Sequence, residues 1–295
     1  MLPTPAMNNI LLLVAGLGAA GLLALTASVA QAEPIPDDCK TGGFAIGCQA
    51  WSFNHYTVLE AIEKTAAAGG KVMELYPGQK LSPANPVPFN HDSPDDQIQA
   101  VQAKLAQCHV RAVNYGVVDI PKDEAGARKV FAFAKKLGLY GLTTESIGSL
   151  DTIEKLVKEY DVRVGIHDHP RRPQDPAYRN WDPNFILSLV KDRDARIGAC
   201  ADTGHWLRSG LEPLDCLRIL KGRIMSAHLK DLNEKSPQAH DVPYGTGVAD
   251  VAVLLDELKS QHFDGNISVE YEHNWETSVP EIAQCIGFVR GYGAK

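Results

Sequence analysis

The chain of 295 residues is 44% hydrophobic and 22% charged, with 25 Gly and 18 Pro, a composition that excludes collagen-like, coiled-coil and generally disordered proteins. Asp plus Glu number 36 against 29 Lys plus Arg, which gives a formal net charge of −7, and no basic run exceeds two residues. A protein that binds nucleic acid by neutralising phosphates is therefore disfavoured.

The first 32 residues carry no charged side chain and include an apolar or small-residue run over residues 10–30. Ala30, Gln31 and Ala32 follow, and a small-x-small site after an apolar core is typical of a cleaved secretory signal peptide. We expect residues 1–32 to be this signal peptide, 33–43 to be an N-terminal extension, and the protein to be periplasmic or secreted without stable membrane insertion. An uncleaved anchor is the alternative, because a run of this length can cross a bilayer.

Short β-branched and apolar runs alternate with longer segments of helical period through the rest of the chain. The predicted strands are residues 44–53, 72–76, 110–118, 141–145, 162–167, 197–202, 224–228 and 266–271. Apolar residues recur at three- and four-residue spacing over residues 57–68, 95–107, 123–137 and 248–262, as amphipathic helices require. Pro-rich residues 82–94 and 170–183 are predicted to be long loops.

Eight strand-helix units in about 250 residues match the size of a closed (β/α)₈ TIM barrel, so we predict a single α/β domain over residues 44–295. A doubly wound open sheet is the alternative, but the first strand is not followed by a Gly-rich dinucleotide turn. The six cysteines are irregularly spaced, so their pairing is left open. Cys48 and Cys200 lie in apolar strands and are expected to be buried free thiols.

Acidic and imidazole side chains gather at the C-terminal ends of six predicted strands. They are Glu74, Glu145, His167 with His169, Asp202 with His205, His228 with Lys230, and Glu270 with Glu272. In a parallel barrel these ends converge on one mouth. Because carboxylates and imidazoles crowded at one point require a counter-charge, we expect a divalent metal ion there.

Each of these residues also has a structural interpretation. Glu270 would need a partner after its apolar strand, and a salt bridge to Lys230 is the alternative to metal binding. Asp202 could cap the following turn through backbone N–H groups. His228 alone would be a core histidine, and Glu74 could pair with Lys80.

Four motifs occur in order: ADTGHW at 201–206, AHLKD at 227–231, DVPYGTG at 241–247 and GNISVEYE at 265–272. Together they resemble the xylose-isomerase-like TIM barrels, or sugar phosphate isomerases/epimerases, over residues 44–292. In ketose epimerases of that family, Glu, Asp, His and Glu from the last four strands hold one metal. The resemblance implies metal-binding roles for Asp202, His228 and Glu270.

The chain departs from this pattern at the first ligand, where His167 stands in place of the usual Glu. A plain two-glutamate epimerisation is thereby put in doubt, and Glu145 on the neighbouring strand is the candidate to restore the missing carboxylate. Glu145 is also open as a general base or an ion-pair partner. In the AP endonuclease branch of the family, His205 and His240 would match, but the Asp-x-His pairing before the turn is absent, so we do not expect a three-zinc site.

The resulting hypothesis is a metal-dependent sugar isomerase or epimerase that acts through an enediolate. The predicted ion is Mn²⁺, Mg²⁺, Co²⁺ or Zn²⁺, held by His167, Asp202, His228, Glu270 and Glu145. Glu145 or Glu270 would transfer the α-proton, and His169 would serve as a proton shuttle. Predicted substrate-binding residues are Glu74, His205, Lys230 and Trp51.

An exported protein without a phosphate cradle suits a neutral sugar, a keto-sugar or a keto-glycoside better than a sugar phosphate. Trp51, Tyr76, Trp181 and Trp275 lie near strand ends, where they could stack on a sugar or simply pack in the core. The alternative functions are a keto-sugar lyase or hydratase, a non-catalytic carbohydrate-binding barrel and a nuclease-like phosphodiesterase. The predicted partner is a small-molecule carbohydrate, and homo-oligomerisation is left open.

Overall fold

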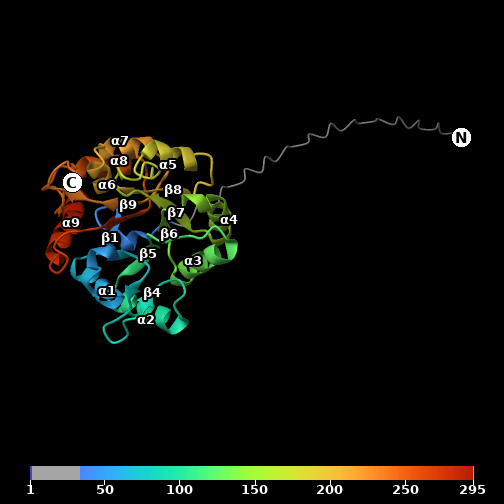
Figure 1. Cartoon of the computed structure of the whole chain (residues 1–295). Helices are drawn as coiled ribbons and strands as arrows, with labels where there is room; N and C mark the ends of the chain where they lie inside the picture. The colour runs from blue at the N-terminus through green and yellow to red at the C-terminus, as the bar shows by residue number, and fades with distance from the viewer. Residues whose placement is uncertain (2–33, 295) are drawn as a thin grey trace. The chain divides into compact units, whose positions relative to one another are not determined.

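Eight parallel strands pair side by side until the last meets the first in the computed structural model, which describes Met1 and residues 34–294 (Figure 1). In chain order they are β1 (Ala45–Gln49), β2 (Val72–Leu75), β5 (Arg111–Tyr115), β6 (Gly141–Thr144), β7 (Arg163–His167), β8 (Ile197–Asp202), β9 (Ile224–Leu229) and β12 (Asn266–Val269). Ala45 of β1 lies opposite Asn266 of β12, while Gly47 lies opposite Val72 of β2. This closure confirms the predicted TIM barrel and excludes the open sheet. Apart from Met1, the predicted signal peptide lies outside the described residues.

Helices surround the barrel (Figure 1). They are α1 (Val58–Ala67), α2 (Asp95–Gln107), α3 (Glu124–Leu137), α4 (Leu150–Tyr160), α5 (Pro183–Val190), α6 (Thr203–Arg208), α7 (Pro213–Ile219), α8 (Val251–Ser260) and α9 (Val279–Tyr292). Two antiparallel pairs, β3 (Gln79–Lys80) with β4 (Pro88–Phe89) and β10 (Asp231–Leu232) with β11 (Asp241–Val242), lie in connecting segments.

Helix starts follow the local chemistry of the sequence. Thr57 and Glu60 form a reciprocal capping box before α1, which satisfies backbone N–H groups of its first turn. Asp123 accepts a hydrogen bond from the backbone N–H of Gly126 at the start of α3. Asp182 caps α5, whose first residue is proline. The four periodic segments therefore form helices within three residues of their predicted bounds.

Three predicted strands end two or more residues earlier in the structure than predicted. The run predicted over residues 44–53 ends at Gln49, because the Gln49 side chain accepts the backbone N–H of Trp51 and turns the chain into a 3-10 helix, Ala50–Phe53. The run predicted over residues 110–118 is strand only over Arg111–Tyr115. The last strand ends at Val269, so Glu270 and Glu272 follow it rather than belong to it.

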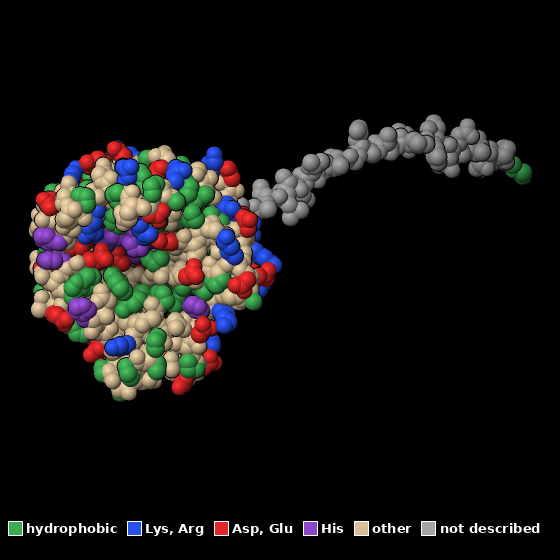
Figure 2. Space-filling model, viewed as in Figure 1, with side chains coloured by type: hydrophobic (Ala, Val, Ile, Leu, Met, Phe, Trp, Pro, Cys, Tyr) green, Lys and Arg blue, Asp and Glu red, His purple; other side chains and the backbone are tan. Residues whose placement is uncertain are grey.

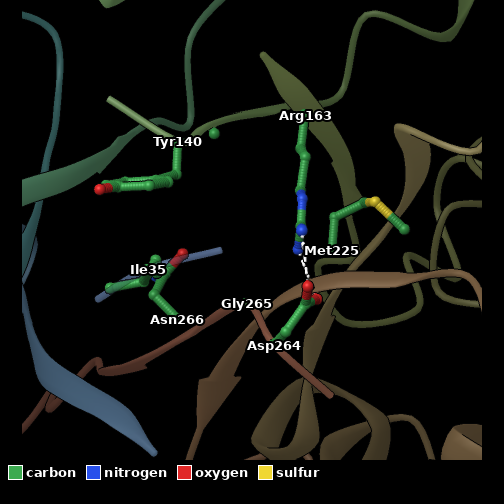
Figure 3. A pocket seen from close by; sticks show the side chains of 8 residues that line it. Ile35, Tyr140, Arg163, Met225, Asp264, Gly265 and Asn266 are labelled. Carbon is green, nitrogen blue, oxygen red and sulfur yellow. Dashed lines mark hydrogen bonds and ion pairs between the residues drawn. The ribbon is translucent and has the colours of Figure 1, made fainter. Parts of the chain in front are cut away.

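Side chains close the N-terminal end of the barrel. Ile35 of the extension is 2% exposed and packs with Ala45, Val72 and Val113 beneath the strands. Figure 3 shows this end, where the Arg163 guanidinium donates to the Asp264 carboxylate. The pocket left there holds about 10 Å³, too little for more than one water molecule. This pocket therefore has no room for a small-molecule ligand.

All six cysteines lie in the described part and are free thiols. Cys48 and Cys200 are buried, as expected. Within residues 34–294, no helix combines the length and apolar character needed to cross a membrane.

Candidate active site

Four buried side chains bring donor atoms together at the C-terminal end of the barrel. His167 ends β7, Asp202 ends β8, His228 lies on β9 and Glu270 follows β12. Their donor atoms all lie within 4.8 Å of one another. Histidine and acidic side chains also gather in a hollow on the face shown in Figure 2. The barrel thus joins four of the five residues that were predicted to bind metal.

The separations within this four-donor cluster suit a single ion. His167 Nε2 and His228 Nδ1 are 3.1 Å apart, and His228 Nδ1 lies 3.3 Å from Glu270 Oε2. Asp202 Oδ2 lies 3.8 Å from His167 Nε2 and 3.9 Å from His228 Nδ1. Ligands about 2.1 Å from a tetrahedral ion are roughly 3.4 Å from each other, close to these values. The donor set of two imidazoles and two carboxylates fits a first-row divalent ion.

Asp202 caps the following helix, as one of its two predicted roles requires, and its other oxygen faces the four-donor cluster. Its Oδ1 accepts the backbone N–H of His205 and so caps α6. Its Oδ2 is buried, meets no hydrogen-bond geometry among the described residues and faces the other cluster atoms. The charged group beside this oxygen is the Lys230 ammonium, at 3.1 Å. A buried carboxylate requires such a cation.

The four-donor cluster lies beside one cationic side chain, Lys230. Its buried Nζ lies 3.1 Å from Asp202 Oδ2, 2.8 Å from Glu270 Oε2 and 2.7 Å from Glu272 Oε2. Burial alone would lower the pKa of Lys230, but these carboxylates raise it well above its usual range. For Glu270 the two effects are reversed. Burial raises its pKa, but the positive charges of Lys230 and His228 hold that pKa well below its usual range. Glu270 therefore has its predicted salt bridge and also faces the cluster.

The glycine of the ADTGHW motif makes room for this lysine. A Cβ on Gly204 would lie 2.7 Å from Cδ of Lys230, closer than real contacts allow. The next residue, His205, is buried, with Nε2 3.5 Å from Asp202 Oδ2, and burial lowers its pKa well below the usual range. His205 therefore stands beside the cluster in its neutral form.

Glu74 lies behind the cluster rather than at its mouth. It is fully buried, and its Oε2 accepts hydrogen bonds from His228 Nε2 at 2.9 Å and Ser268 Oγ at 2.7 Å. This bond directs the other nitrogen of His228, Nδ1, toward the cluster, as carboxylates commonly do for metal-binding histidines. The predicted contact of Glu74 with substrate does not fit this position, because β2 places the side chain in the barrel interior below the mouth. The alternative pair with Lys80 is also wrong, since Lys80 is exposed.

Glu145 and His169 form a separate pair beside the cluster. Glu145 Oε1 lies 2.6 Å from His169 Nδ1 and accepts a 2.6 Å bond from the Tyr178 hydroxyl. The same oxygen is 3.9 Å from His167 Nδ1, which is the far side of the His167 ring from the four-donor cluster. Burial raises the pKa of Glu145, but bonds to His167, His169 and Tyr178 hold it far below its usual range. Glu145 is thus grouped with His167 and His169, and not with Asp202, His228 and Glu270.

A cavity of about 310 Å³ opens beside these groups, a size typical of small-molecule sites. His169, Glu270 and Glu272 line one side of it. The other side is lined by residues of the first two strand ends and the loop after β5: Gln49, Trp51, Tyr76, Pro77, Gly116 and Val117. The Trp51 ring is 41% exposed and stands edge-on to Tyr76 at 5.1 Å. The other two aromatic candidates lie elsewhere, Trp181 beneath Arg171 and Trp275 against His55.

The DVPYGTG motif is held by one buried carboxylate. Asp231 accepts backbone N–H bonds from Gly245, Gly247 and Ala249 at 2.9 to 3.0 Å. A Cβ on Gly247 would lie 2.3 Å from Asp231 Oδ1, so only glycine fits. His240, before the turn, stacks near His273 and belongs to none of the donor groups within the described residues.

Several residues near the site were not singled out from the sequence. Asp168 accepts the backbone N–H of Asp202, and Cys200 lies with His167 and His228. Cys200 had a signal, because alternation along β8 turns residues 200 and 202 to the same side. Tyr178 had none, since it comes from a long irregular loop.

Comparisons with known proteins agree with the fold and the motifs. A family profile described as "Xylose isomerase-like TIM barrel" matches residues 143–288. A solved putative uncharacterized protein from Parabacteroides distasonis is 33% identical, covering 84% of this chain and 98% of its own, with a TM-score of 0.67. A D-tagatose 3-epimerase-like protein is 16% identical, with 84% and 96% coverage and a TM-score of 0.64. A D-psicose 3-epimerase solved in the presence of D-fructose is 13% identical, with 84% and 96% coverage and a TM-score of 0.62. No curated protein matches the sequence.

Proposed function

Because the chain belongs to the xylose isomerase-like TIM-barrel family, we propose that it is a divalent-metal-dependent sugar isomerase or epimerase acting through an enediolate. The observation that carries this proposal is the four-donor cluster beside a 310 Å³ cavity. The sugar epimerases among its structural neighbours support a keto-sugar substrate. We propose a neutral sugar, keto-sugar or keto-glycoside, because the described residues that line the 310 Å³ cavity include no Lys or Arg. The nearby Lys230 is already paired with three carboxylates.

His167, Asp202, His228 and Glu270 would hold the metal ion. When bound, Mn²⁺, Mg²⁺, Co²⁺ or Zn²⁺ would polarise the sugar carbonyl and stabilise negative charge that develops on its oxygen. Glu74 would keep Nδ1 of His228 directed at the ion by accepting from Nε2. Glu145 is left out of this ligand set because its Oε1 is bound by His169 and Tyr178 and lies on the far side of the His167 ring from the cluster.

The chain's own groups would move the protons. Glu270 stays ionised beside Lys230 and reaches the cavity, so it is placed to remove the α-proton of a bound keto-sugar. His169 lines the same cavity, and its Nδ1 would donate to Glu145, so Nε2 is the nitrogen that would exchange a proton with the sugar. Nε2 would accept a proton when the ring is neutral and return it from the protonated ring. Trp51 and Tyr76 supply an aromatic wall for an apolar sugar face.

One observation favours a lyase as the second candidate. The only carboxylates lining the cavity, within the described residues, are Glu270 and Glu272, and both bind Lys230. Glu145 is held by His169 and Tyr178, so no second free carboxylate faces the substrate to reprotonate carbon. In an elimination, Glu270 would take the α-proton and the C–H electron pair would form the double bond. The bond from the β-carbon to oxygen would break with its electron pair on oxygen, and the protonated His169 ring would give that oxygen its Nε2 proton.

Export is proposed on the N-terminal sequence alone. The uncharged run over residues 10–30 followed by Ala30, Gln31 and Ala32 supports cleavage after Ala32 and a periplasmic or secreted protein. N-terminal sequencing of the protein made by cells tests this, and an intact Met1 or Met7 would contradict it.

Proton exchange in D₂O tests the activity. With Mn²⁺ present, the protein should exchange the α-proton of at least one member of a keto-sugar panel, and Glu270→Gln should slow exchange by about 10²- to 10⁴-fold. Glu63→Gln on the outer helix α1 is the matched control and should exchange like wild type. Product analysis separates an isomer or epimer from an unsaturated sugar. If no sugar of the panel exchanges although sugars bind, a non-catalytic carbohydrate-binding barrel replaces the proposal.

A further inference from the structure

The interior of the barrel contains connected polar side chains below the four-donor cluster. Asn266 and Ser268 alternate with Ile267 and Val269 along β12, so both turn to one face of the strand. Their side chains are bonded to residues of β5 and β2, which do not pair with β12, and these bonds therefore cross the barrel interior. The interior of a TIM barrel is usually filled with bulky, branched apolar residues, so this barrel departs from the common pattern.

The bonds between these side chains run in one direction, toward the four-donor cluster. Asn114 Nδ2 donates to Asn266 Oδ1 at 3.3 Å, and Asn266 Nδ2 donates to Ser268 Oγ at 2.9 Å. Ser268 Oγ donates to Glu74 Oε2 at 2.7 Å, and the same oxygen accepts His228 Nε2 at 2.9 Å. We call Asn114, Asn266, Ser268 and Glu74 the polar column. All four are buried, with at most 3% of each residue exposed.

The far end of the polar column lies near the N-terminal end of the barrel. Asn266 starts β12 and lines the small pocket at that end, which Figure 3 shows. Asn114 Nδ2 also donates to Thr143 Oγ1 at 3.1 Å, and Asn114 Oδ1 accepts the backbone N–H of Tyr115 at 2.8 Å. The nitrogen and the oxygen of both amides thus have partners, so this end of the column is held in place.

The last bond of the polar column determines which nitrogen of His228 faces the four-donor cluster. Because Nε2 donates to Glu74, Nδ1 is the nitrogen beside His167 and Glu270. Glu74 holds this orientation only while its Oε2 stays in place, and its Oε1 is buried without a hydrogen-bond partner among the described residues. Within the described part of the chain, Ser268 is the one donor besides His228 that anchors this carboxylate.

We propose that Ser268 and Asn266 are positioning residues for the metal site, because they hold the Glu74 carboxylate that keeps Nδ1 of His228 directed at the ion. This inference rests on the metal binding proposed above. Neither residue lines the 310 Å³ cavity, so both act through Glu74. Each bond also polarises the donor of the next, which strengthens the bond to the carboxylate. Metal affinity at one end of the barrel therefore depends on a side chain near the other end.

Titration of the metal-free proteins with Zn²⁺ and Mn²⁺ tests this inference without a sugar. Ser268→Ala removes one hydrogen bond from Glu74 and should weaken binding of both ions by about threefold to tenfold. Asn266→Ala, one bond further from the ion, should weaken binding by about twofold to threefold. Asn266→Ala keeps the test valid if Ser268→Ala impairs folding.

Ser226→Ala is the matched control. Ser226 is also a buried serine of the barrel, two residues before His228 on β9, but its Oγ has no hydrogen-bond partner within residues 34–294. The control removes the same hydroxyl at a similar depth without touching the polar column. It should bind both ions like wild type.

A second measurement separates positioning from a purely structural role. In the Zn²⁺-loaded protein with isotope-labelled histidine, nuclear magnetic resonance reports the exchange of the His228 Nε2 proton with water. Ser268→Ala should speed this exchange by about threefold to tenfold, whereas Ser226→Ala should leave it unchanged. A serine that only fills the core would lower the free energy of unfolding when replaced, with normal metal affinity and normal exchange.

The inference is overturned if Ser268→Ala binds both ions as tightly as wild type, or if Ser226→Ala weakens binding to the same extent. Its failure can be distinguished from failure of the proposed function. A wild-type protein that binds neither ion overturns the metal site and, with it, the role of the polar column. A protein whose metal affinity depends on Ser268 but which exchanges no α-proton has the polar column without the proposed sugar chemistry.

Discussion

The two halves of the barrel mouth have different character. The first half, from β1 to β6, gives the cavity neutral walls: Gln49, Trp51, Tyr76, Pro77, Gly116 and Val117. The second half, from β7 to β12, gives the buried charged cluster of His167, Asp202, His228, Lys230 and Glu270. The family profile matches residues 143–288, which contain the charged half. The charged cluster and the neutral cavity walls thus come from different segments of one chain.

Two acidic residues of the first half contact the charged half. Glu74 of β2 binds His228 and Ser268 across the barrel interior. Glu145, which follows β6, binds His169. The charged half therefore depends on residues from the half that otherwise shapes the cavity.

The largest expected effect is on metal affinity, which should fall when His167 is replaced but not when Glu145 is replaced. His167→Ala removes a predicted ligand and should weaken metal binding by at least about 10³-fold, more than the 10- to 100-fold typical of supporting residues. Glu145→Gln should leave metal affinity almost unchanged, because Glu145 lies on the far side of the His167 ring. Titration of the metal-free proteins with Mn²⁺ or Zn²⁺ measures both. If Glu145→Gln lowers affinity as strongly, Glu145 is a ligand and the four-donor assignment is incorrect.

We expect Asp241, in the charged half, to make the free energy of unfolding depend on pH. Burial raises the pKa of Asp241 to about 6, although Lys230 and Arg208 act in the opposite direction. A carboxyl whose pKa is higher when folded binds more protons in the folded state, so its contribution to stability falls as the pH rises from about 4 through 6. The free energy of unfolding of wild type minus that of Asp241→Asn should therefore fall by roughly 2 kcal/mol between pH 4.5 and pH 7.5.

Urea denaturation at the two pH values measures this difference. Asp96→Asn, at an exposed position on α2, is the control and should show no such change. A wild-type-minus-variant difference that stays constant with pH would show that Asp241 titrates normally.

The smallest of the three effects concerns the link between the halves. Glu74→Gln keeps the shape of the side chain but replaces the charged acceptor of His228 with a neutral one. Metal affinity should fall about tenfold, at the low end for residues that support a metal-binding histidine. Glu276→Gln, a carboxylate exposed to solvent, should have no effect on metal affinity. Unchanged affinity in Glu74→Gln would mean that Glu74 only fills the core.

Residues whose position follows from strand alternation were predictable from the sequence, and others were not. Asp202 and His228 end apolar strands, so a closed barrel brings them together whatever its details. Glu74 also lies near the end of an apolar strand. Whether its side chain reaches the mouth or stays inside the barrel depends on how far β2 extends, which the sequence does not show. Gln79, in the two-residue strand β3, and Tyr178, in a loop, lie in connecting segments whose paths depend on tertiary contacts, such as the bonds from Gln79 Nε2 to Phe53 and Tyr56. No periodicity in the sequence reports such contacts.

The Asp231 bonds to Gly245, Gly247 and Ala249 separate the segment after β9 into a fixed part and a free part. The β10–β11 pair closes the base of this segment, and residues 233–238 beyond it are largely exposed. Added length at this tip would leave the barrel's backbone pairing intact. It is consequently the natural place in this chain to graft an affinity tag, a reporter domain or a longer covering loop.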